Sequence, residues 1–290
     1  MTKTAHRIYI SSFFIITIAA TLILSIVGFN YYLTPVENRF FLPQDILLKP
    51  SGLIGHGLGI IGTFLMTVGV VSYMIRKRVR YFHKFGRLPY WLEFHIFLCT
   101  LGPILILFHT AFMFGGIVSV SFWSMVAVVA SGAIGRFIYV QIPHSINGQM
   151  LSMNELNSLN ENLSHQLVEF AIPGNLLASI ESIAAIDRYK RIKLSQSLVF
   201  VIQDYIGIKN VRNRLNRELR AAKVSKHQRK IILKAAKEKL VISRRIGLLQ
   251  TMQKIFRYWH VVHLPFAIIM FIILFIHVAV EIILGYRWIF

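Results

Sequence analysis

Apolar stretches long enough to cross a lipid bilayer dominate the chain. They cover about residues 8–32, 52–75, 91–115, 118–140 and 259–285 of the 290. A helix needs about 20 consecutive apolar residues to span the hydrocarbon core of a membrane, and 55% of this chain is hydrophobic. The sequence therefore predicts an all-α integral membrane protein with five transmembrane helices, and it excludes an ordinary soluble enzyme.

The net charge of +20 is concentrated outside these stretches. Lys3 and Arg7 precede the first one, residues 76–90 hold six basic residues and no acidic one, and residues 141–257 hold 20 basic against 8 acidic residues. Basic loops stay on the cytoplasmic side of a membrane. We therefore expect the N-terminus and 141–257 to be cytoplasmic and the C-terminus periplasmic, in a bacterial inner membrane. The charge then reflects topology and attraction to membrane lipid, with a specific acidic partner as the alternative and no nucleic acid.

Three parts follow from this pattern: spans one to four in 1–140, a basic helical cytoplasmic domain in 141–257, and the fifth span in 258–290. In the cytoplasmic part, Ser152 and Glu155 form a capping box that predicts a helix to about Phe170. Helical patterns resume at 175–187 and 193–207, and a long basic helix begins at Ser225 and runs into the last span. We expect this domain to dock a partner or to shield a cofactor.

Two of the five stretches carry the same histidine pattern. His95 and His109 lie fourteen residues apart in the third span, and His263 and His277 lie fourteen apart in the fifth. Fourteen helical residues bring two side chains within about 40° of one face and about 21 Å apart along the axis. Both spans run outward from the cytoplasm, so the two pairs match in depth. Two haems held by paired histidines, one above the other across a membrane, require this arrangement of ligands.

Further residues are candidates for contact with such a cofactor. His56, in the glycine-rich second span, is expected to hydrogen-bond a haem propionate, a quinone or the backbone rather than to ligate iron. Arg136, near the inner end of the fourth span, can reach lipid phosphate or pair with a propionate. The glycines of the second span permit close approach of either a helix or a porphyrin. His260 is the alternative to His263 as a ligand, and the fourteen-residue symmetry favours His263.

The paired H-x13-H pattern on two parallel helices, with a glycine-rich helix before the first, resembles the di-haem four-helix core of membrane b-type cytochromes. Two branches are similar over about 52–140 and 258–285: cytochrome b of the quinol:cytochrome c oxidoreductases, and the transmembrane domain of ferric reductases and NADPH oxidases. The resemblance implies His95 and His263 as ligands of an inner haem, and His109 and His277 as ligands of an outer one. The chain departs from both branches, because neither a flavin and nicotinamide domain nor a P-E-W quinol motif is visible in it.

The expected function is transmembrane electron transfer through two haem b groups, as the membrane subunit of a respiratory or redox complex. Its partners would be redox subunits such as a multihaem cytochrome c, an iron–sulfur protein or a flavoprotein, and a quinone could bind near His56 or near the inner haem. Two alternatives stay open. One is a self-contained reductase of ferric iron or another metal, and the other is a proton or metal transporter, which would be colourless.

Overall fold

The computed structural model describes residues 2–116, 118–143, 151–170, 174–186 and 196–284. Within these ranges all regular structure is helical, and no strand occurs. The chain divides into two compact units. The first unit is formed by Met1–Ala133 and Val262–Phe290, and the second unit by Ile134–Val261.

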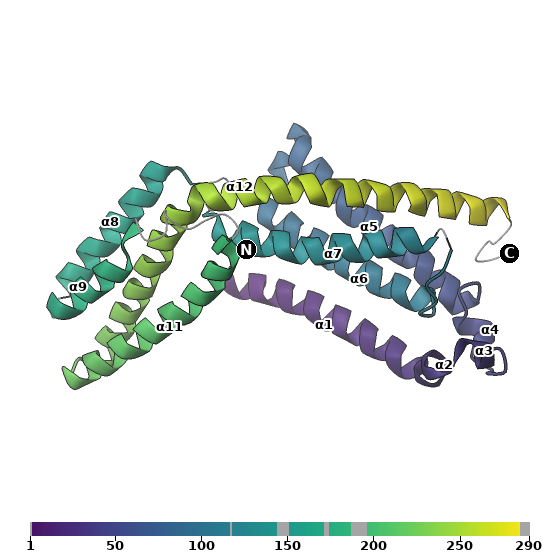
Figure 1. Ribbon diagram of the computed structural model, residues 1–290, viewed down its shortest axis with the longest axis horizontal. Coiled ribbons are helices and arrows are strands. Elements are labelled where there is room, and N and C mark those ends of the chain that lie inside the picture. The colour runs from purple at the N-terminus through teal and green to yellow at the C-terminus, as the bar shows by residue number, and fades with distance from the viewer. Residues whose placement is uncertain (1, 117, 144–150, 171–173, 187–195, 285–290) are drawn as a thin grey trace. The chain divides into compact units, whose positions relative to one another are not determined.

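Five helices are long and apolar enough to cross a membrane, which confirms the predicted number of spans. They are α1 (Lys3–Val27), α5 (Leu53–Arg78), α6 (Leu88–His109), α7 (Val118–Gln141) and α12 (Lys226–Ile283), labelled in Figure 1. Large apolar side chains on them are exposed, such as Ile26 at 72% and Phe64 at 64%. Surfaces of this kind are stable in contact with lipid rather than water, so the structure is compatible with an integral membrane protein.

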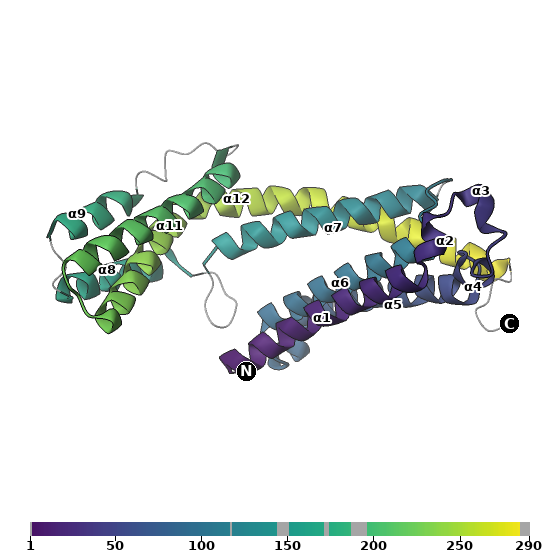
Figure 2. The same cartoon turned by 90° about the horizontal axis from the view of Figure 1, so that it is seen from below.

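In the first unit, α5 and α6 run side by side (Figure 2). Their backbones approach each other closely where glycines of the two helices meet. A Cβ atom added to Gly62 would lie 2.8 Å from the Gly102 carbonyl oxygen, and one added to Gly102 would lie 2.7 Å from that of Gly62. Farther along, a Cβ on Gly69 would lie 3.0 Å from the Cβ of Leu98. At these glycines the structure therefore shows close helix contact, one of the two uses expected of them.

The four helices that carry or flank the histidines share one apolar core. Met66 of α5, Phe122 and Met125 of α7 and Met270 of α12 are buried together, and Ile106 of α6 packs against them. A buried hydrogen bond from Ser121 Oγ to the Met270 carbonyl oxygen, 3.1 Å long, also joins α7 to α12. The helix α1 lies outside this group and packs on α6, where the Phe13 and Phe97 rings stack with centroids 4.2 Å apart.

The segment between α1 and α5, which the charge pattern predicts to be external, contains three short helices, α2 (Phe29–Leu33), α3 (Val36–Arg39) and α4 (Asp45–Leu48). The predicted first span is interrupted, because the helix ends at Val27 and restarts after Gly28. A Cβ on Gly28 would lie 2.1 Å from the ring of Tyr32. The ring can therefore fold back against the chain only because residue 28 has no side chain.

The third span also ends earlier than predicted, at His109 rather than near residue 115. Ala111 and Phe112 have positive φ angles of 48° and 60°, which a continuing α-helix does not allow. The buried guanidinium of Arg39 donates a 2.6 Å hydrogen bond to the Ala111 carbonyl oxygen. It also donates to the carbonyl oxygens of Thr34 and Tyr32, at 2.9 Å and 3.1 Å. Arg39 thereby ties the end of α6 to the external segment.

The second unit contains α8 (Met153–Glu169), α9 (Gly174–Ile183), α11 (Ser197–Ala221) and the parts of α7 and α12 within 134–261. The predicted capping box is present, since the Ser152 hydroxyl accepts a bond from the Glu155 amide and the Glu155 carboxylate accepts one from the Ser152 amide. The prediction of a continuous helix from the basic segment into the last span is confirmed by α12. Three apolar clusters among the described residues, around Leu219, Leu248 and Leu240, form the cores of this unit.

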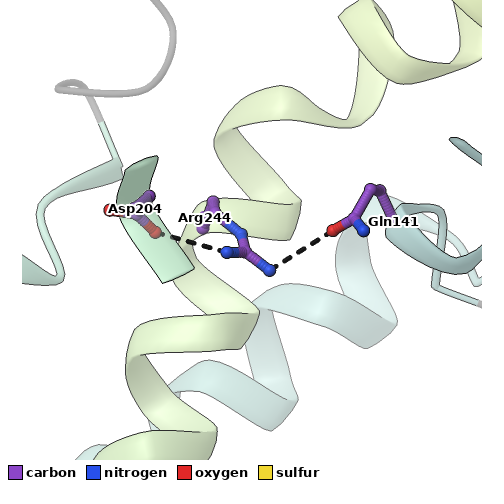
Figure 3. Close-up of polar contacts among 3 residues, drawn as sticks. All are labelled: Gln141, Asp204 and Arg244. Atoms are coloured by element: carbon purple, nitrogen blue, oxygen red, sulfur yellow. Dashed lines mark hydrogen bonds and ion pairs between the residues drawn. The ribbon is translucent and has the colours of Figure 1, made fainter. Parts of the chain in front are cut away.

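A buried polar contact fixes α11 and α7 to α12 within the second unit (Figure 3). The Arg244 guanidinium lies 3.4 Å from Asp204 Oδ2, and both side chains are less than 10% exposed. Its other terminal nitrogen donates to Gln141 Oε1 at 3.3 Å. A buried charge is tolerated when it is paired in this way, and removal of one partner is costly.

We predict that Arg244→Leu lowers the stability of the purified protein by about 3–5 kcal/mol, because Asp204 loses its buried cation. The double variant Arg244→Leu/Asp204→Leu should recover part of that loss. Thermal unfolding in detergent measures both. The control is Arg214→Leu, which breaks an exposed pair with Glu218 and should cost less than about 1 kcal/mol. Additive losses in the double variant would contradict a coupled pair.

Candidate functional site

His109 is the last residue of α6, and the glycines of α5 fix the position of its ring. Its Nδ1 atom lies 2.8 Å from the Gly55 carbonyl oxygen. A carbonyl oxygen only accepts, so Nδ1 carries the proton and the lone pair of the ring is on Nε2. A Cβ on Gly59 would lie 2.9 Å from Nδ1 and 3.0 Å from two ring carbons. The ring therefore lies against α5 where that helix has no side chain.

His277 lies on α12, one helical turn before Glu281. Its Nδ1 atom is 3.8 Å from Glu281 Oε1, which is within ion-pair range but longer than a hydrogen bond. Both side chains are partly exposed, at 26% and 33%. The carboxylate thus lies on the Nδ1 side of this imidazole, as the Gly55 carbonyl lies on the Nδ1 side of His109.

His109 and His277 line one cavity of about 980 Å³. Its wall comes from α5, α6, α7, α12 and residues 49–51, and Met66, Met125 and Met270 of the shared core form part of it. Most of the lining is apolar. The volume lies at the upper end of the range of about 300–1,000 Å³ that pockets for ligands and cofactors occupy. The structure thus brings two of the four predicted ligands to a single large apolar cavity.

His56 lines the same cavity, with its ring centroid 6.5 Å from that of His109. Lys49 and Glu281 add an amino group and a carboxylate to the wall. The structure thus places His56 beside His109, and contact of His56 with a haem propionate or a quinone stays a prediction. Lys49 was not singled out in the sequence, because nothing in a lone lysine of a loop indicates that the loop folds over a cavity.

The other predicted pair is held by the same type of contact. His95 Nδ1 lies 3.0 Å from the Gly69 carbonyl oxygen, and the Cys99 sulfur is 3.6 Å from the same nitrogen. His263 Nδ1 lies 2.6 Å from Ser131 Oγ, so this contact joins α12 to α7. Neither histidine is among the described residues that line the cavity. Each of the four predicted ligands therefore has an oxygen atom facing its Nδ1 atom.

The sequence analysis did not identify any of the four residues whose oxygen atoms face the histidines. They are Gly55, Gly69, Ser131 and Glu281. Only Glu281 had a local signal, because it follows His277 by four residues on one helix face. The other three belong to helices different from those of their histidines. Their pairing depends on how the helices pack, which the spacing along a single chain does not encode.

Arg136 and His260 lie in the second unit and are not among the residues that line the cavity. The Arg136 guanidinium carbon lies 5.6 Å from the centroid of the Tyr139 ring, a cation–π distance. The His260 ring packs edge-on against Trp259, with centroids 4.8 Å apart. Contact of Arg136 with a propionate stays a prediction.

Among the described residues, no group of three or more His, Cys, Asp or Glu side chains is arranged to hold a bare metal ion. Comparison of the chain with protein-family models, curated proteins and solved structures gave no match. The similarity to b-type cytochromes therefore rests on the histidine and glycine pattern of this chain alone.

We predict that Arg39→Met destabilises the protein by about 3 kcal/mol or more, because three carbonyl oxygens lose their donor at the end of α6. Arg39→Lys should restore only part of the loss, since an ammonium cannot reach all three oxygens in the geometry of a guanidinium. Thermal unfolding of the purified protein measures the effect. The control is Arg80→Met at an exposed position, and equal midpoints for both methionine variants would refute the role of Arg39.

Proposed function

We propose that this protein transfers electrons across a membrane through two b-type haems, each held by two histidines. His109 and His277 hold the outer haem, and His95 and His263 hold the inner one. The protein acts as the membrane subunit of a respiratory or redox complex. It exchanges electrons between quinone and a separate redox subunit. That subunit is a multihaem cytochrome c, an iron–sulfur protein or a flavoprotein.

The observation that carries the proposal is the cavity between His109 and His277. A large, mostly apolar cavity lined by imidazoles from two different helices would fit a flat, largely apolar group such as haem, which His109 and His277 would hold. Donation from His109 Nδ1 to the Gly55 carbonyl leaves the Nε2 lone pair for a metal. Ligating histidines in metal sites almost always have this type of partner on the second ring nitrogen.

The protein residues then do three things. The Gly55 and Gly69 carbonyls and the Ser131 hydroxyl fix the ring orientation of His109, His95 and His263. The Glu281 carboxylate lies on the Nδ1 side of the His277 ring, at 3.8 Å. The mostly apolar wall of the cavity offers water few hydrogen-bond partners. A haem bound to two imidazoles supplies a one-electron couple with no open coordination position for oxygen.

The spacing of the two pairs supports transfer across the membrane rather than within one leaflet. Fourteen residues correspond to about 21 Å along a helix, against about 30 Å for the hydrocarbon core. His109 ends α6 beside the external segment, whereas His95 lies about two turns after the start of that helix, where the basic segment 76–90 ends. The two pairs therefore divide the span between an outer and an inner half.

A reduced-minus-oxidised visible spectrum and a pyridine haemochrome assay of the purified protein test the proposal. We expect two haem b per chain. His109→Leu and His277→Leu should each lose the outer haem and keep much of the inner one, and His95→Leu and His263→Leu should do the reverse. His165→Leu, at an exposed position of α8, is the matched control and should keep both.

Full haem content in all four variants would refute the ligand assignment. A folded protein without haem, made with an adequate haem supply, would refute the proposal and favour transport of protons or metal. Haem together with ferric reduction by the isolated chain would favour the self-contained reductase over a subunit of a larger complex.

Gly59 lies under the His109 ring, and substitution of this glycine tests the position of that ring. Gly59→Val should halve the haem content, because its Cβ alone would lie 2.9 Å from His109 Nδ1 and must displace the ring. Gly132→Ala is the control, since a Cβ there meets nothing within 4 Å. The haemochrome assay of the two variants measures the difference. Equal haem content in both would contradict the position given to His109.

A further inference from the structure

The second unit exposes an apolar stripe on the first half of α11. Val199, Ile202, Tyr205 and Ile206 are 57%, 57%, 67% and 56% exposed. At 100° per residue they lie within an arc of about 120° on one side of the helix. A stripe of this kind is unusual on a surface in water and indicates that another phase or molecule covers it.

The opposite face of the same half-helix packs against the chain at the edge of the spans. Val201 is buried in one cluster with Ile142 and Met252, and Phe200, Phe137 and Phe256 pack against that cluster. Ile142 directly follows the end of α7. Met252 and Phe256 lie on α12, where the basic residues Lys254 and Arg257 give way to the apolar run of the fifth span. The first half of α11 is therefore packed at the level where the spans leave the hydrocarbon core.

The charge of α11 changes along its length. The stripe itself carries no charge, whereas residues 205–230 contain nine Lys or Arg and one acidic residue, Glu218. Exposed basic side chains begin at Lys209 and continue with Arg212, Arg214 and Arg217. An apolar face joined to a basic segment is the pattern of helices that lie in the interface of a bilayer with anionic lipid.

We propose that the first half of α11 lies in the headgroup region of the cytoplasmic leaflet, with the stripe of Val199, Ile202, Tyr205 and Ile206 turned toward the acyl chains. The basic second half binds anionic headgroups. The inference rests on the spans and the second unit, and it holds whether or not the protein binds haem.

Nitroxide labels on the full-length protein in vesicles test this surface. Ile202→Cys and Ile206→Cys, each in a Cys99→Ala background, report on the stripe. The control is Asn213→Cys, an exposed position on α11. It lies along the helix about 16 Å beyond Ile202 and about 10 Å beyond Ile206. The readout is the accessibility of each label to oxygen, which concentrates in lipid, relative to a water-soluble nickel chelate. The vesicles contain phosphatidylcholine with phosphatidylglycerol.

We expect an oxygen-to-nickel ratio severalfold higher at 202 and 206 than at 213, and a fall in the first two ratios when phosphatidylglycerol is omitted. Ratios at 202 and 206 equal to that at 213 would place the stripe in water and overturn the proposal. Labels shielded from both reagents would show that protein, a second copy or a partner subunit, covers the stripe, and would overturn it too. An unchanged ratio without phosphatidylglycerol would overturn the part assigned to the basic residues.

Discussion

The close contact of α5 with α6 determines the position of both histidines on α6. In the interior of a membrane, a polar ring needs an internal partner, because neither water nor lipid tails offer one. Here the partner is the α5 backbone, whose carbonyl oxygens at Gly55 and Gly69 accept from His109 and His95. At Gly59 the absence of a side chain lets α5 lie directly against the His109 ring.

The cavity lies beside the tightly packed helices α5 and α6. The glycines bring α5 and α6 together over most of their length, and the core around Met66, Met125 and Met270 joins them to α7 and α12. Beyond that core the external segment, held by Arg39, folds over the end of α6. The cavity is therefore bounded by packed methionines on one side and by a hydrogen-bonded loop on the other.

Periodicity and caps predicted much of this fold from the sequence, because both are local. The five spans, the capping box at Ser152 and the continuous α12 all depend on residues that are neighbours along the chain. The early end of α6 was missed, and there the Ala111 carbonyl oxygen accepts a hydrogen bond from Arg39, a residue 72 positions away. The oxygen atoms that face three of the four histidines were missed for the same reason. Tertiary contacts of this kind leave no pattern in a single sequence.

The four histidines differ in the type of oxygen that holds them. Those of α6 face backbone carbonyls of α5, whereas those of α12 face side chains, Ser131 for His263 and Glu281 for His277. A carbonyl acceptor does not change when its residue is substituted, so the α6 rings are sensitive only to steric change at the glycines. Ser131 and Glu281 contact their histidines through side chains. One substitution at either position changes the charge or the hydrogen-bonding group that faces the ring. The contacts of the α12 imidazoles can therefore be changed by substitution of one side chain, whereas those of the α6 imidazoles depend on how closely α5 packs against α6.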